Sequence, residues 1–422
     1  MNSILFKLYI LLIFQNVMFG MKSSLMETSS FIGVCSQITR QSKAYNPYSI
    51  HKDLLNACSD ANINLTRTGF KWKFIHPSKN EWNWEITDTI VNSAKARNIN
   101  ILAVIGGMPV PYMESPLNYI DLWLEFVDSL TIRYKSDIFY WEIWNEPNIR
   151  AGKYWPQNQL PEPFAEYVIR AAEIIKKNQP ESIILLSGLA SSKKSNPFGL
   201  WESLFKLNVL EKIDGVAYHP YKYPGLKLIE FNKKLKKLIS KYSKNEKQLW
   251  VTEFGIPAVS SVNSGKFSFN YQKDQILQSI LIHWATGGSK FFIYSLIDKS
   301  EMDPRATRKQ NRQKIKGFFG LLEKNMLEKP SYKGVKWLSS IINDYNPLEI
   351  EVTSDGIIIT ALNKKNGEKA FFSWGSKANN RLYDNKSINS VSFAKSTKKE
   401  IQLDTEVSIK NTFGNSEVVY WY

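Results

Sequence analysis

The sequence predicts an α/β protein: a closed (β/α)8 TIM barrel followed by a small C-terminal antiparallel β-sandwich module. Strand-like and helix-like stretches alternate eight times between residues 31 and 345, which is typical of a parallel barrel. After Pro347 the pattern changes to short strands separated by turns. We therefore divide the 422 residues into a signal peptide (1–22), a catalytic barrel (30–346) and a β module (347–422).

The eight barrel strands are runs of β-branched and other apolar residues bounded by polar or turn residues. They are expected at residues 31–35, 65–70, 101–105, 138–144, 183–187, 215–218, 249–253 and 291–296. The stretches between them are amphipathic or rich in helix formers. Helices are expected at residues 49–61, 87–97, 117–134, 163–177, 199–207, 227–242, 271–286 and 332–343.

The β module is expected to contain strands at residues 350–353, 356–362, 369–374, 390–393, 406–409 and 418–421. Asn366-Gly367 marks one of its turns. We expect the module to brace the barrel. Trp374 and Trp421 are interpreted as its core, with glycan binding as the alternative.

The N-terminus predicts a secretory signal. Lys7 is the only charge in the first twenty residues, and a nearly unbroken apolar run follows it at 8–14. The run is too short for a stable membrane span, and cleavage is expected near residues 20–24. This places the protein outside the cytoplasm, as a secreted, periplasmic or cell-surface protein. Small residues are scarce at the cleavage site, so an uncleaved anchor remains the alternative.

The composition limits the partners and cofactors. A net charge of +16 favours anionic partners, but no nucleic-acid motif accompanies it, so an acidic glycan is the partner that stays open. Four histidines with no Cys/His cluster predict no metal site, and no phosphate-binding loop is present, so no cofactor is expected. Cys35 and Cys58 are interpreted as buried packing residues, although the pair could bridge in an oxidising compartment.

Two strands end in a glutamate that is followed by a proline. Residues 141–148 read Trp-Glu-Ile-Trp-Asn-Glu-Pro-Asn and place Glu146 at the end of the fourth strand. Residues 249–257 read Leu-Trp-Val-Thr-Glu-Phe-Gly-Ile-Pro and place Glu253 at the end of the seventh. Barrel active sites lie at these carboxyl ends. Either glutamate alone could simply cap a strand or pair with an arginine, but the two together predict a two-carboxylate glycosidase.

These two motifs resemble those of the clan A glycoside hydrolases. Within the clan the chain is most similar to family 39 and its exopolysaccharide-hydrolase and β-xylosidase relatives, over roughly residues 30 to 345. The resemblance implies a (β/α)8 barrel and a retaining mechanism. It also implies that Glu146 is the acid/base and Glu253 the nucleophile.

Arg67, at the end of the second strand, needs a carboxylate partner because an inward arginine is costly unless it is paired. The resemblance implies that Arg67 keeps Glu253 ionised. An Arg67–Glu142 pair is the alternative, with Glu142 lying deeper on the fourth strand as a structural residue.

The resemblance also implies further substrate-binding residues. Asn145 would bond the sugar 2-hydroxyl, His219 would line the floor of the sugar site, and Tyr221 would bond the nucleophile. Trp72, just after the second strand, and Tyr294, at the end of the eighth, are expected to offer aromatic surface to the sugar, with a core role as the alternative for Tyr294. The charged run at residues 298–313 forms either a basic rim or a solvated loop.

The leading prediction is therefore a secreted retaining glycoside hydrolase of polysaccharides or oligosaccharides, with the two carboxyls about 5 to 5.5 Å apart. A non-catalytic glycan-binding barrel and a transglycosylase are the alternatives. The sugar, the choice between endo and exo attack, and the oligomeric state are left open.

Overall fold

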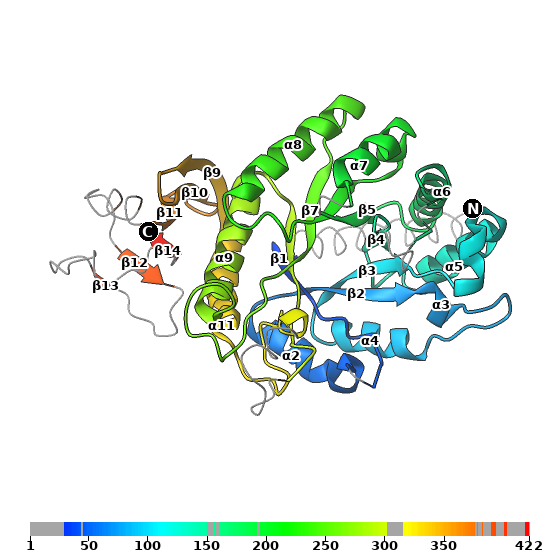
Figure 1. Ribbon diagram of the computed structural model, residues 1–422, viewed down its shortest axis with the longest axis horizontal. Coiled ribbons are helices and arrows are strands. Elements are labelled where there is room, and N and C mark those ends of the chain that lie inside the picture. The colour runs from blue at the N-terminus through cyan, green and yellow to red at the C-terminus, as the bar shows by residue number, and fades with distance from the viewer. Residues whose placement is uncertain are drawn as a thin grey trace, which may run out of the picture.

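The computed structural model describes residues 29–421 except 44, 150–154, 157, 159, 192–194, 302–314, 376–377, 379–381, 383–389, 394–400 and 403–417. Eight parallel strands close into a barrel in sequence order, as predicted (Figure 1). The signal peptide, most of the charged run at 298–313 and the strand expected at 406–409 lie outside the described residues.

The barrel strands differ from their predicted bounds by a few residues at most. They are β1 (Ile32–Cys35), β2 (Leu65–Lys71), β3 (Asn100–Gly106), β4 (Tyr140–Asn145), β5 (Ile183–Ala190), β6 (Gly215–His219), β7 (Gln248–Phe254) and β8 (Lys290–Ile293). The pairing of β1 with β8 closes the ring, with Gly33 opposite Phe292.

All eight predicted helices are present on the outside of the barrel. They are α2 (His51–Asp60), α4 (Glu85–Lys95), α5 (Ile120–Arg133), α6 (Glu162–Asn178), α7 (Pro197–Lys206), α8 (Lys227–Tyr242), α9 (Phe269–Ala285) and α11 (Pro330–Ser339). A single turn, α3 (Trp72–Ile75), follows β2 directly. Within the described residues, none of the helices combines the length and apolar character that crossing a bilayer requires.

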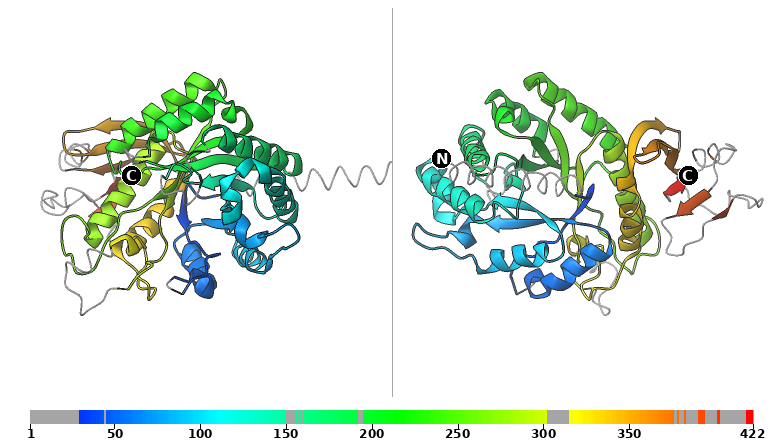
Figure 2. Two further views of the ribbon diagram at one scale, coloured as in Figure 1. Left: turned by 45° about the vertical axis from the view of Figure 1, so that its right-hand side comes forward. Right: turned by 180° about the vertical axis from the view of Figure 1, so that it is seen from behind.

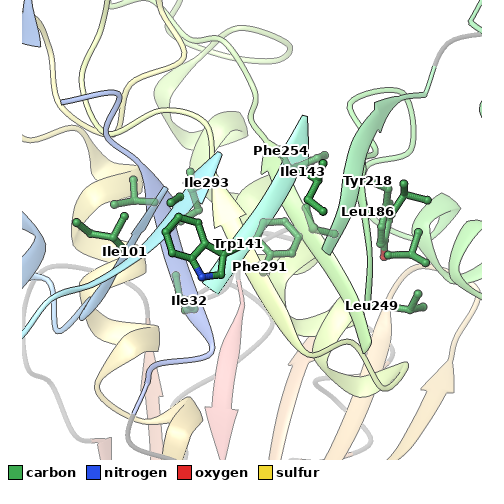
Figure 3. Packing of buried hydrophobic residues seen from close by; sticks show 14 of the residues in the cluster. Ile32, Ile101, Trp141, Ile143, Leu186, Tyr218, Leu249, Phe254, Phe291 and Ile293 are labelled. Atoms are coloured by element: carbon green, nitrogen blue, oxygen red, sulfur yellow. The ribbon is translucent and has the colours of Figure 1, made fainter. Parts of the chain in front are cut away.

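The strands bury both of their faces. Their outward side chains pack under the helices and include Ile101, Trp141, Ile143, Phe254 and Phe291 (Figure 3). Their inward side chains fill the amino-terminal half of the barrel with Cys35, Leu65, Leu102, Tyr140, Leu185, Ala217, Trp250 and Phe292. Because this half is filled by apolar groups, polar side chains are left for the carboxyl-terminal half.

The C-terminal module is an antiparallel sheet in the order β13-β12-β14-β11-β10-β9. Its strands are β9 (Tyr345–Val352), β10 (Ile357–Asn363), β11 (Lys369–Trp374), β12 (Ser390–Phe393), β13 (Ile401–Gln402) and β14 (Val419–Trp421). Where a sandwich was expected, the described residues form this one sheet. It lies beside α9, where Phe372 meets Trp284 edge-to-face at 5.6 Å (Figure 2). Trp374 and Trp421 are buried, as predicted for core residues.

The two cysteines are buried and free, in keeping with the packing role predicted for them. Cys35 lies inside the barrel, where its thiol donates to the Thr252 carbonyl at 3.2 Å. Burial raises the pKa of Cys58 to about 12, so this thiol stays protonated at neutral pH.

Candidate active site

The carboxyl ends of β2, β4, β6 and β7 bring the predicted catalytic residues together. Glu146 directly follows β4, and Glu253 is the second-last residue of β7. One carboxylate oxygen of each glutamate and Nδ1 of His219 all lie within 4.8 Å of one another. The two carboxyls expected from the sequence therefore face each other across the barrel mouth.

The backbone after β4 departs from a regular strand. Trp144 has φ +75° and Glu146 has φ +47°, in a region that non-glycine residues rarely adopt and that costs roughly 1–3 kcal/mol per residue. Trp144 consequently turns toward the helices, where it packs edge-to-face on Trp155 at 5.0 Å and on Tyr167 at 6.3 Å. Asn145 is thereby free to face the interior. The strain thus sets the direction of the residues that lead into Glu146.

A second irregularity lies in β7, where the pairing with β8 shifts register between Val251 and Phe254. Thr252 and Glu253 are neighbours and would point to opposite faces of a regular strand. Here both reach the interior, because Thr252 bonds Glu142 and Glu253 bonds Arg67. The shift places the glutamate and the threonine in the same polar layer.

Arg67 is the centre of that layer. Its Nε and Nη2 donate to the two oxygens of Glu142 at 2.7 and 3.0 Å, and its Nη1 donates to Glu253 at 2.6 Å. Nη2 also donates to the Asn145 side-chain oxygen at 2.6 Å. Burial opposes the charge, but the two carboxylates outweigh it and raise the Arg67 pKa well above its usual value. Both predicted partners of Arg67 are therefore present at once.

The surroundings of Glu253 favour its ionised form. Burial works against the charge, since the residue is only 9% exposed. The positive charge of His219 when its ring is protonated, the positive charge of Arg67, and hydrogen bonds from Tyr221 and Arg67 nevertheless lower the Glu253 pKa to about 2. The Tyr221 hydroxyl donates to Oε2 at 2.9 Å, while Arg67 holds Oε1. A carboxylate in this state is ready to act as a nucleophile at neutral pH.

Glu146 has a different set of partners. Its Oε1 lies 2.9 Å from Nδ1 of the fully buried His219, and its backbone N–H donates to the Gly188 carbonyl at 3.0 Å. No arginine contacts it among the described residues. The two glutamates therefore sit in unlike environments, as one acid and one nucleophile require.

Of the remaining residues predicted to bind substrate, Asn145 and Tyr294 lie at the site and Trp72 does not. Asn145 presents its side-chain oxygen to Arg67, and within the described part of the chain no hydrogen bond occupies its amide hydrogens. Tyr294 lies beside Tyr221, edge-to-face at 6.1 Å, and accepts a hydrogen bond from Lys299. Both residues therefore lie at the site, where a sugar could reach them.

The prediction that Trp72 offers aromatic surface to the sugar is wrong. It is fully buried and packs between Trp123 at 5.6 Å and Phe126 at 6.4 Å, so it cannot touch a sugar. The reason is the alternation of β2: Arg67 points inward, so Trp72, five residues later, points outward under the helices. The inward position next to it is Lys71.

Lys71 was not singled out from the sequence. Its side chain crosses Gly69 and Gly107 at the barrel mouth: a Cβ at Gly69 would lie 2.9 Å from Cε, and one at Gly107 would lie 3.0 Å from Cδ. Burial and the nearby Arg67 charge lower its pKa to about 8, against a smaller attraction from Glu253. Its ammonium has no hydrogen bond or ion pair with another described residue.

The group formed by Glu146, His219 and Glu253 could offer three ligand atoms to a metal ion. The Arg67 guanidinium lies 2.6 Å from one oxygen of Glu253, and its charge opposes a cation there. The residues therefore fit acid–base and nucleophilic chemistry better than metal binding.

A cavity of about 810 Å³ lies at the opposite, amino-terminal end of the barrel. Its lining includes Lys236, Lys247, Trp250 and Lys290. Glu246 is the one carboxylate among its described lining residues. Because the described lining holds no pair of carboxylates, we assign the two-carboxylate chemistry to the carboxyl-terminal end of the barrel.

Comparison with known proteins agrees with this geometry. The family model described as cellulase (glycosyl hydrolase family 5) matches residues 24–286, more than half of the chain. A search of curated proteins found no match.

Solved structures with the same fold include several glycosidases. A family 39 glycoside hydrolase from the gut symbiont Bacteroides cellulosilyticus WH2 has a TM-score of 0.65 at 16% identity, over 94% of this chain and 81% of that one. A monomeric beta-xylosidase from Caulobacter crescentus CB15 has 0.56 at 16%, over 79% and 73%. Xylanase 10B from Thermotoga petrophila RKU-1 has 0.52 at 17%, over 75% and 95%. At these identities the likeness shows the fold.

Proposed function

Since the chain belongs to the cellulase family, glycosyl hydrolase family 5 of clan A, it is a glycosidase, and we propose that it cleaves O-glycosidic bonds by a retaining double displacement. The predicted clan is confirmed, while the likeness to family 39 is one of fold. The observation that carries the mechanism is the close approach of the Glu146 and Glu253 oxygens, within 4.8 Å. This supports retention, because an inverting pair stands about 6.5–9.5 Å apart to admit a water.

In the first step Glu146 protonates the leaving oxygen while Glu253 attacks the anomeric carbon. The glycosidic bond breaks and a covalent glycosyl–Glu253 ester forms. In the second step Glu146, now ionised, takes a proton from water, which attacks the anomeric carbon and releases Glu253. Both steps need the two carboxyls on opposite faces of the anomeric carbon of one sugar, and the approach of their oxygens to within 4.8 Å supports this.

The neighbouring groups prepare these steps. Arg67 and Tyr221 hold one oxygen each of Glu253 and keep it ionised. Arg67 also fixes Asn145 by its side-chain oxygen, which leaves the amide hydrogens for the sugar 2-hydroxyl. A bond at that hydroxyl strengthens in the transition state.

We further propose that the substrate is a polysaccharide or oligosaccharide that carries acidic groups. The basic chain as a whole and Lys71 at the barrel mouth, which makes no ion pair with another described residue, support this. Carboxylate or sulfate on a bound sugar would give the Lys71 ammonium an ion-pair partner. Lys71→Met should raise KM for acidic oligosaccharides at least tenfold and leave KM for their neutral or carboxyl-reduced forms nearly unchanged.

The matched control for Lys71→Met is Lys73→Met, which removes an exposed lysine two residues away. Equal losses on acidic and reduced substrates would contradict the charge-recognition proposal. The retaining mechanism would survive that result, because it does not depend on Lys71.

We also propose that residues 1–22 direct the protein out of the cytoplasm. The apolar run at 8–14 after a single lysine supports this. Expression of the full chain with mass measurement of the exported product tests it. A mature N-terminus near residues 20–24 is expected; retention of the full-length chain in the cytoplasm would contradict it.

The test of the function is the release of reducing ends from a panel of neutral and acidic polysaccharides. Glu253→Gln should lose release completely, whereas Glu349→Gln, on the exposed face of β9, should retain it. Tight binding by the native chain without release by either would instead favour a glycan-binding barrel. Products longer than the substrate would indicate transglycosylation.

A further inference from the structure

A line of buried polar groups runs from Glu142 to the acid/base. Thr252 Oγ1 lies 3.1 Å from Oε1 of Glu142 and 3.1 Å from Nε2 of His219. Nδ1 of the same ring lies 2.9 Å from Oε1 of Glu146. Glu142, Thr252 and His219 are fully buried, so these bonds are shielded from water. The direction of each hydrogen bond in the line is set by Glu142, which can only accept.

The fixed end is Glu142. Arg67 donates to both of its oxygens, and the Gly188 backbone N–H donates to Oε1 at 3.0 Å. A carboxyl with these three donors is an ionised acceptor. The Thr252 hydroxyl must therefore give its single proton to Glu142.

Because the Thr252 hydroxyl hydrogen is used in the bond to Glu142, the Thr252 oxygen can only accept from His219. Nε2 of His219 must then carry a hydrogen. A neutral His219 has no second hydrogen, so Nδ1 presents a lone pair to Glu146. The 2.9 Å contact is consequently a hydrogen bond only when one further proton lies between Glu146 Oε1 and Nδ1.

We propose that Thr252, backed by Glu142, is a positioning residue that fixes His219 with its hydrogen on Nε2, so that Glu146 and His219 hold one shared proton for the leaving group. The inference rests on the proposed role of Glu146 as the acid/base. After the proton has left with the departing sugar, an ionised Glu146 faces the Nδ1 lone pair. That repulsion promotes uptake of a proton from water, which the second step requires.

The packing holds the ring in this orientation. A Cβ on Gly188 would lie 2.1 Å from Nε2 of His219, so the ring rests directly on the glycine backbone. Two further titratable groups among the described residues contact His219: Glu253 on β7, at 3.9 Å from Nδ1, and Tyr221 on its own segment. Glu253 is already held by Arg67 and Tyr221, and burial raises the pKa of Cys35, which lies near Glu253, so this thiol stays neutral.

The first test is the pH dependence of kcat/KM for Thr252→Val, measured on an aryl glycoside that the native chain cleaves. Valine keeps the shape but offers Nε2 no acceptor, so the hydrogen of His219 can move to Nδ1 and bond an ionised Glu146. The alkaline limb should move down by about one to two pH units, the size expected of one charge-assisted hydrogen bond. Thr252→Ser, which keeps the hydroxyl, should restore the native alkaline limb.

The leaving group gives a second readout. Protonation matters for phenyl glycosides and much less for dinitrophenyl glycosides, whose leaving group departs as a stable anion. Thr252→Val should therefore lose at least tenfold more activity on the former than on the latter at neutral pH. An equal loss on both would point to a merely structural role and overturn the proposal.

The third test needs no substrate. The ¹⁵N shifts of the four histidines distinguish the two neutral ring forms, and His219→Gln identifies the His219 signals. The native chain should show hydrogen on Nε2 above the alkaline limb. Hydrogen on Nδ1 of native His219 would overturn the proposal while leaving the retaining mechanism intact, which loss of activity in Glu253→Gln tests separately.

Discussion

Replacing Tyr221 with phenylalanine removes one oxygen and therefore one interaction, the 2.9 Å hydrogen bond to Oε2 of Glu253. A hydrogen bond to a charged group contributes roughly 1.5–3 kcal/mol. Its loss should raise the Glu253 pKa from about 2 by roughly one to two units, because Arg67 still holds the other oxygen. Glu253 is also the leaving group of the second step, and a more basic carboxylate leaves more slowly. We expect kcat to fall about tenfold or more, with about 150-fold as the upper limit.

The assay is kcat and kcat/KM of Tyr221→Phe and native chain from pH 2 to 8, with activity after return to neutral pH as the control for unfolding. The acid limb of kcat/KM should move upward by about one to two pH units in the variant. The phenylalanine ring retains the packing against Phe319 and Tyr294, so the melting temperature should change little. An unchanged acid limb with kcat within twofold of native would refute the reasoning that Tyr221 stabilises an ionised nucleophile.

Three further results are expected. Trp72→Leu should cost about 2–4 kcal/mol in urea unfolding through the cavity it leaves, with KM unchanged; a raised KM would restore Trp72 as a sugar contact. Gly188→Ala should lower both the melting temperature and kcat, because its Cβ would displace the His219 ring; native activity would show that the contact relaxes freely. The Glu253 pKa is depressed from 4.5 to about 2, so its contribution of about 3 kcal/mol is present above pH 4.5 and lost as the pH falls through 2. The free energy of unfolding of the native chain should fall as the pH is lowered from 4.5 to 2. The same fall in Glu253→Gln would show that another group causes it.

The fold and the central carboxylates could be predicted because their signals are local. Each is an apolar run that ends in a glutamate and a proline, and each lies where a barrel collects its functional groups. Charge balance predicted that Arg67 needs a carboxylate, because a buried guanidinium is costly alone. The resemblance to clan A pointed to Glu253, with Glu142 as the alternative, and the structure pairs Arg67 with both.

The rest depended on backbone irregularities that composition does not reveal. In a regular strand Thr252 and Glu253 would point to opposite faces, one inside the barrel and one outside. Only the register shift in β7 brings both side chains inside. Trp144 likewise leaves the interior through its positive φ. Trp72 and Lys71 are a different case: counting by twos from Arg67 places Lys71 inward and Trp72 outward, so the signal was present in the sequence.

The most direct test of the two-glutamate mechanism is to trap the covalent intermediate. The native chain is treated with a 2-deoxy-2-fluoro glycoside of the sugar that it releases, carrying an activated leaving group, and is then digested for mass spectrometry. We predict one added glycosyl group on the peptide that contains Glu253, and none in Glu253→Gln. A product of inverted anomeric configuration, or a glycosyl group on another residue, would contradict the account.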